Sequence, residues 1–186
     1  MTQPQKGGGG FLAQACACLT IPYWSQYFNI NQKELFERFK ACVNPTSTAL
    51  KEKVHNKPDL YGPFWICTTL ILTLVISESL FSVLVGLTRI GEKPKGGFSF
   101  DFKLVGLAMS VVYGAFSMFP MLFIAANKVF GSNVPVIKSA SIYGYSFLVF
   151  VVASLICIVP IYFIRLLVWM GAAGHSICFL FFNFRE

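Results

Sequence analysis

The chain has 186 residues, of which 55% are hydrophobic and only 12% are charged. Average soluble domains carry about 25% charged residues, so this composition, with several apolar runs near 20 residues, predicts a membrane protein. The net charge of +7 contains no long basic run, so it does not indicate nucleic-acid binding and suits segments that face anionic lipid headgroups. The first 60 residues show no pattern of a cleavable signal peptide.

Residues 1–57 form a polar and basic arm in front of the first apolar run. Residues 1–10 are rich in Gln and Gly, and we expect the segment 1–20 to be disordered. Asn31 followed by Glu34 is a capping-box pattern, which predicts an amphipathic helix over about 31–43. Two interpretations of this helix stay open: it lies on the membrane surface, or it packs on the protein's own spans.

The polar side chains of the arm predict no metal or cofactor site. Cys16 and Cys18 have the wrong spacing for a zinc knuckle, so free thiols are expected, with S-acylation as the alternative. His55 lies in the segment 46–57, predicted to be a polar linker, and has no histidine or cysteine partner at ligand spacing.

Four apolar runs predict an all-α membrane protein whose domain, 58–186, is a bundle of four transmembrane helices. Their expected limits are about 63–87, 104–126, 139–159 and 161–182. Pro120 is expected to kink the second span, and Pro160 to end the third before a tight turn into the fourth.

Two short motifs carry a resemblance to a known family. Asp59-Leu60-Tyr61-Gly62-Pro63-Phe64-Trp65 directly precedes the first span, and Tyr143-Gly144-Tyr145-Ser146 lies in the third. This ordered pair resembles the signatures of the Yip family, membrane proteins of the Golgi and early secretory route that interact with Ypt/Rab GTPases. The resemblance covers roughly 21–186. The family has five spans, so this chain is expected to be a fragment, an alternative product or a four-span variant.

The resemblance implies that partners bind at the first signature, with the residue associated with function at Asp59. The segment expected to bind partners comprises Asp59, Leu60, Tyr61, Gly62 and Pro63. An aspartate before a helix also suits N-terminal capping, and both roles can hold for Asp59.

Small residues in the third and fourth spans predict close helix packing, since they let two backbones approach. The positions are Gly144 and Tyr145 in the third span, and Gly171 and Gly174 in the fourth.

Two ionisable side chains lie inside the predicted spans. Glu78 is the single acidic residue of any span, and such a residue by default indicates function. The alternative is a carboxyl that reaches water at the far interface or hydrogen-bonds to a neighbouring helix. His175 is expected to hydrogen-bond to a neighbouring helix.

No paired carboxylates, metal-ligand cluster or phosphate loop are evident, so a non-enzymatic role is expected. Lys and Arg are nearly balanced across the spans, and Lys33, Arg38 and Lys40 of the arm favour a cytoplasmic N-terminus. The resemblance implies a Golgi or transport-vesicle adaptor in ER-to-Golgi and related vesicle-mediated transport. Such an adaptor binds prenylated Rab GTPases and pairs with another Yip-type protein, in Golgi membranes or in ER, vesicle or endosome membranes. The alternative is a small ion or solute transporter subunit that uses Glu78.

Overall fold

The structure, a computed structural model, describes residues 25–88, 102–130 and 135–184. The segment expected to be disordered, 1–20, lies outside the described residues, as do Cys16 and Cys18. The described residues form helices and turns without a strand. The helices are α3 (Gln32–Val43), α4 (Ala49–Asn56), α5 (Tyr61–Thr88), α6 (Phe102–Phe130), α7 (Val136–Ser146), α8 (Leu148–Ile156) and α9 (Tyr162–Phe184).

The prediction of an all-α membrane protein with four transmembrane helices is confirmed. Four helical segments are long and apolar enough to cross a bilayer, namely Tyr61–Leu87, Phe102–Phe123, Val136–Ile156 and Tyr162–Phe184. Each differs from the expected span by at most three residues at an end.

The third span is two helices, not one. Helix α7 ends at Ser146 and α8 begins at Leu148, with Phe147 between them donating its backbone N–H to the Gly144 carbonyl. Such a tightened turn inside a helix changes the direction of the axis. Helix α8 then ends at Ile156, several residues before Pro160.

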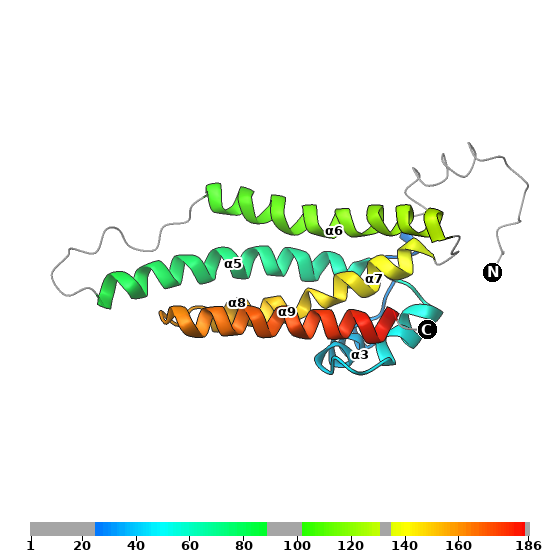
Figure 1. Ribbon diagram of the computed structural model, residues 1–186, viewed down its shortest axis with the longest axis horizontal. Helices are drawn as coiled ribbons and strands as arrows, with labels where there is room; N and C mark the ends of the chain where they lie inside the picture. The colour runs from blue at the N-terminus through cyan, green and yellow to red at the C-terminus, as the bar shows by residue number, and fades with distance from the viewer. Residues whose placement is uncertain (1–24, 89–101, 131–134, 185–186) are drawn as a thin grey trace, which may run out of the picture.

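Helix α5 lies at the centre of the bundle and packs against α6, α7 and α8. Helix α9 packs against α8 and α7 on the other side (Figure 1). The two ends of the bundle are formed by different parts of the chain. One end, which we call the arm end, holds the start of α5, the start of α7 and the end of α9.

The arm folds back onto the arm end of the bundle. Helices α3 and α4 contact each other and both contact α7. One buried apolar cluster joins the arm to the spans and contains Cys42, Leu50, Val54, Ile66, Ile142, Tyr145 and Phe179. The predicted amphipathic helix thus does pack on the protein's own spans, through one of its faces.

Two local predictions for the arm are wrong. The expected linker 46–57 contains helix α4, because Leu50 and Val54 lie one turn apart and bury completely against the bundle. The capping box is not formed: Asn31 precedes α3 but makes no side-chain capping bond. Glu34 instead accepts hydrogen bonds from Arg38 and Lys57.

Candidate functional site

The two signature motifs, far apart in the sequence, meet at the arm end of the bundle. The Tyr145 hydroxyl of α7 donates a 2.9 Å hydrogen bond to Oδ2 of Asp59, a residue that lies just before α5. The same oxygen accepts the backbone N–H of Gly62 at 3.1 Å, which caps the start of α5. The Ser141 hydroxyl donates to the backbone carbonyl of Asp59. Asp59 thereby fixes the start of α5 against α7.

A buried arginine from the arm completes the site. Arg38 Nη1 lies 2.5 Å from Asp59 Oδ1, and the side chains of Arg38 and Asp59 are 0% and 2% exposed. Arg38 Nη2 donates at 2.8 Å to Glu34 Oε1 and to the Lys57 carbonyl. Both carboxylate oxygens of Asp59 are thus occupied by donors. Removing Arg38 would leave the buried Asp59 carboxylate without a cation, and removing Asp59 would leave Arg38 with Glu34 as its remaining acid.

Burial and pairing act on the acidic groups in opposite directions. Desolvation raises the pKa of Asp59, and Arg38 with the donors from Gly62 and Tyr145 opposes that rise. The pKa of Glu34, nearer the surface, is lowered mainly by its hydrogen bond from Arg38. Burial raises the pKa of the Cys42 thiol, one turn beyond Arg38, to about 12. That thiol therefore stays protonated and unreactive while the arm is docked.

Two glycines permit the close approach of α5 and α7. A Cβ placed on Gly62 would come within 2.2 Å of the Tyr145 hydroxyl oxygen. A Cβ on Gly144 would come within 2.4 Å of Pro63 Cβ and 2.9 Å of the Phe116 ring. All three distances are shorter than real side chains allow. Each signature motif therefore supplies a glycine that packs against a side chain of the other motif.

The two glycines expected to pack in the fourth span do not. A Cβ on Gly171 or Gly174 would meet no described atom within 4 Å, and both residues lie on an exposed side of α9. The packing expectation is wrong for this pair, because the small-residue pattern lies on a face of α9 that points away from the described helices.

The remaining members of the first signature surround Asp59. Pro63 is fully buried, Gly62 is buried, and Leu60 and Tyr61 are partly exposed. Tyr61 also belongs to a group of aromatic rings at the start of α5. The ring centroids lie 6.4 Å apart for Phe28 and Tyr61, 6.1 Å for Tyr61 and Trp65, and 5.9 Å for Phe64 and Trp65. Aromatic rings at a span end are typical of the headgroup level.

Helix α9 provides two further contacts to the arm. The His175 ring nitrogen Nε2 lies 3.2 Å from the Val43 carbonyl at the end of α3. Asn183 Nδ2 donates to the Ser47 carbonyl at 3.3 Å. His175 therefore hydrogen-bonds to a neighbouring helix, and that helix belongs to the arm rather than to the spans.

Glu78 and its surroundings lie toward the opposite end of the bundle. Arg165, in the first turn of α9, donates from Nη2 to Glu78 Oε2 at 3.1 Å and lies over the Phe81 ring at 4.1 Å. Glu78 also lines a groove of about 220 Å³ between α5 and α6. The structure thus gives Glu78 a cationic partner from the fourth span.

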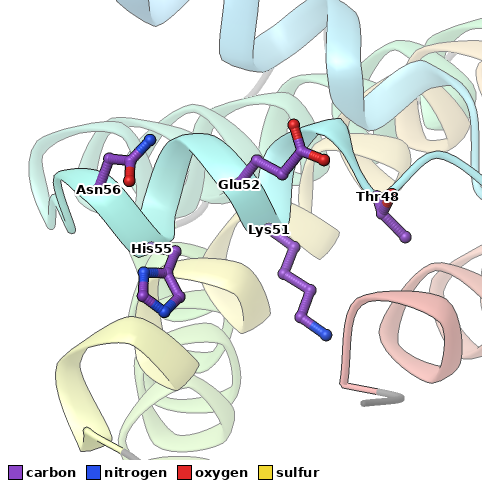
Figure 2. Close-up of a pocket in the computed structure, with 5 residues that line it drawn as sticks. All are labelled: Thr48, Lys51, Glu52, His55 and Asn56. Carbon is purple, nitrogen blue, oxygen red and sulfur yellow. The ribbon is translucent and has the colours of Figure 1, made fainter.

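A second hollow, of about 550 Å³, lies along α4. Lys51 and His55 extend from one side of the helix, and Glu52 and Asn56 from the other (Figure 2). Lys138 Nζ lies 3.4 Å from His55 Nδ1. Side chains of both charge signs line this hollow, so it selects no ligand class by itself. The described residues contain no cluster of three potential metal ligands.

Comparison with known proteins gives a family assignment. The model of the Yip1 domain matches residues 40–186. The chain belongs to the Yip1 domain family. It is 25% identical over 157 residues to the YIPF1 homolog of Dictyostelium discoideum, covering 84% of this chain and 43% of that protein. It is 32% identical over 131 residues to protein YIP5 of Schizosaccharomyces pombe, covering 69% of this chain and 49% of that protein. The chain thus spans less than half the length of these relatives. No solved structure matches it.

The Yip1 domain match covers most of the residues that form this site. Asp59, Gly62, Gly144 and Tyr145 all lie inside the matched residues, whereas Arg38 lies just before them. In the sequence Arg38 counted only among the basic residues of the arm, so its burial was missed. The available signal was its spacing from Leu35 and Cys42, which are three residues before and four residues after Arg38 on the buried face of α3.

Proposed function

We propose that this Yip1 domain chain is a membrane adaptor of vesicle traffic in Golgi and related secretory membranes, with its arm in the cytoplasm. The proposal extends to its partners, which are prenylated Rab GTPases and a second Yip-type membrane protein. Family membership supports the setting. The observation that carries the proposal is the buried contact between Arg38 of the arm and Asp59 of the signature.

The burial of Asp59 decides how it acts on a partner. Because the residue is only 1% exposed, a protein docking at this end of the bundle meets the arm and the partly exposed Leu60 and Tyr61. Asp59 contributes by holding α3 and α4 in place. The partner surface is thus the docked arm together with the edge of α5.

The test is recovery of Rab GTPases and of a second Yip-type protein with the full chain in mild detergent. Asp59→Ala and Arg38→Ala both release the arm, so both are expected to reduce recovery. Gly171→Ala changes an exposed position of α9 outside the arm and is the control. Loss with Asp59→Ala alone would place the partner contact on Asp59 itself and contradict the arm surface.

The transporter alternative is separated in the same experiment by Glu78→Gln. The adaptor proposal expects unchanged partner recovery with this variant, because Glu78 pairs with Arg165 far from the arm end. Failure to recover either partner with folded wild-type protein would overturn the adaptor proposal. A flux abolished by Glu78→Gln would replace it with transport.

A further inference from the structure

Helix α3 lies beside the bundle, at the depth of the spans, rather than beyond their ends. The contact between His175 and the Val43 carbonyl fixes the end of α3 nine residues before Phe184, the last residue of α9. Nine helical residues correspond to about 14 Å of length. Figure 1 shows α3 beside the last turns of α9.

A second observation gives the same depth. The buried face of α3 packs into a cluster that also contains Leu148 and Val151 of α8, beyond the turn at Phe147. The Phe39 ring lies 6.2 Å from the Tyr145 ring. Arg38, in the middle of α3, is level with Asp59 and so with the aromatic rings that begin α5. Helix α3 therefore runs through the headgroup level of a bilayer that the spans cross.

The outward side of α3 is not uniformly polar. Phe36 and Val43 are 65% and 73% exposed, and at 3.6 residues per turn they lie about 20° apart around the axis. Lys33 and Lys40 follow next around the helix, and both are exposed. Glu37 comes after them and faces α4, where Lys53 Nζ lies 2.8 Å from its carboxylate.

We propose that the outer face of α3 is a binding surface for anionic lipid headgroups, with Phe36 and Val43 inserted at the edge of the acyl chains. The order of side chains around the helix matches the order of layers in a leaflet. Phe36 and Val43 meet the chains, Lys33 and Lys40 meet the phosphates, and Glu37 meets water. Lysine stems extend along apolar surface while their ammonium groups reach the phosphates.

The occupant is a lipid leaflet because the end of α3 lies beside His175, which is inside the fourth membrane span, so its exposed apolar side chains face the level of the bilayer. Ile177 of α9, two residues beyond His175, is 67% exposed, so an apolar side chain of the fourth span faces outward near the depth of Val43. Neither Lys33 nor Lys40 forms an ion pair with a described residue, so both are available to phosphates. The inference does not depend on the proposed adaptor function, because it concerns lipid alone.

The experiment places a nitroxide spin label on the full chain in vesicles of phosphatidylcholine with phosphatidylserine. Cys16, Cys18 and Cys178 are replaced by serine, while Cys42, Cys67 and Cys157 remain, since they are buried and do not label. The label is attached at Phe36→Cys or, as a matched control on the same helix, at Glu37→Cys. Its accessibility to oxygen, which concentrates in lipid, is compared with its accessibility to a water-soluble nickel chelate.

The expected result is an oxygen-to-nickel accessibility ratio several-fold higher at position 36 than at position 37. Lys33→Gln with Lys40→Gln should lower that ratio in the anionic vesicles and leave it unchanged in phosphatidylcholine alone. Equal, water-like ratios at both positions would overturn the proposal. A label at position 36 that neither reagent reaches would also overturn it, since protein would then cover the surface. Unchanged protection of Cys42 from maleimide shows in each variant that the arm remains docked.

Discussion

The Asp59 carboxylate and the Tyr145 hydroxyl, 86 positions apart in the chain, share a 2.9 Å hydrogen bond inside a buried site. This bond joins the two signature motifs, and the Arg38 guanidinium ties the arm to the same carboxylate. The start of α5, the end of α7 and the amphipathic helix α3 are therefore positioned by one side chain. Changes at Asp59 are expected to act on all three.

Removing either member of the Arg38–Asp59 pair should undock the arm. Arg38→Ala leaves the buried carboxylate without its cation, at a cost of about 3–5 kcal/mol. Asp59→Ala leaves the guanidinium with Glu34 as its remaining acid, so its cost should be smaller. The measurement is alkylation of Cys42 by N-ethylmaleimide, quantified on its own peptide by mass spectrometry. Cys42 is 4% exposed when docked, so its rate should rise strongly in both variants.

The double variant Arg38→Met with Asp59→Leu sharpens this prediction. Two apolar groups replace two buried charges, so the loss should be much smaller than the sum of the single losses. Glu52→Ala should leave the Cys42 rate at the wild-type value. Additive losses in the double variant would contradict an energetic coupling between Arg38 and Asp59.

Gly144→Ala should destabilise the bundle, because the new methyl would lie 2.4 Å from Pro63 Cβ. Overpacking of this kind costs typically about 1–3 kcal/mol, and it should lower the thermal unfolding midpoint in detergent. The same change at Gly171 has open space around it and should be neutral or slightly stabilising, since alanine favours helix. Equal midpoints for Gly144→Ala and the wild type would show that α5 and α7 are not in close contact.

Docking of the arm should depend on acidic pH through Glu34. The hydrogen bond from Arg38 lowers the pKa of Glu34 in the folded protein below the ordinary 4.5. A lowered carboxyl pKa adds stability above the ordinary value and loses it as the pH falls through the folded value. Hydrogen exchange of α3 amides, corrected for intrinsic rates, should therefore show protection falling below pH 4.5 in the wild type.

Glu34→Gln is the control for that experiment, since it removes the titrating group and keeps its size. Its α3 protection should be lower at neutral pH and should change less between neutral and acidic solution. Asp59 titrates in both proteins, and the variant also removes the Glu34 charge that contributes to raising the pKa of Asp59. Identical pH profiles for the two proteins would assign the acid sensitivity to another group.

Hydropathy predicted the four spans because crossing a bilayer depends on the summed transfer energy of about 20 residues, which the sequence contains directly. The two motifs contain the residues that join α5 to α7, although the sequence alone did not predict that contact. The sequence did not predict the break at Phe147, the helix α4 or the burial of Arg38. Each depends on a neighbour from another segment: Arg38 is buried because Asp59 and Glu34 pair with it. Likewise, Gly144 packs closely and Gly171 does not, although both patterns look alike in sequence.

The Glu78–Arg165 pair should stabilise the bundle only weakly. The two side chains are 44% and 24% exposed and lie near the end opposite the arm, so water screens much of their attraction. Glu78→Gln is expected to lower stability by less than about 1 kcal/mol. Arg165→Ala should cost more, because it also removes the cation over the Phe81 ring, a contact worth about 0.5–1 kcal/mol at exposed sites.

Thermal unfolding of Glu78→Gln, of Arg165→Ala and of the double variant in one detergent measures the contributions of the ion pair and of the contact between Arg165 and the Phe81 ring. Phe81→Leu in the Arg165→Ala background should then have less effect than in the wild type, since the ring has lost its cation. A large loss of stability with Glu78→Gln alone would contradict a solvent-screened pair. It would instead indicate a carboxylate buried in the assembled protein, which is the arrangement that an ion pathway through the bundle requires.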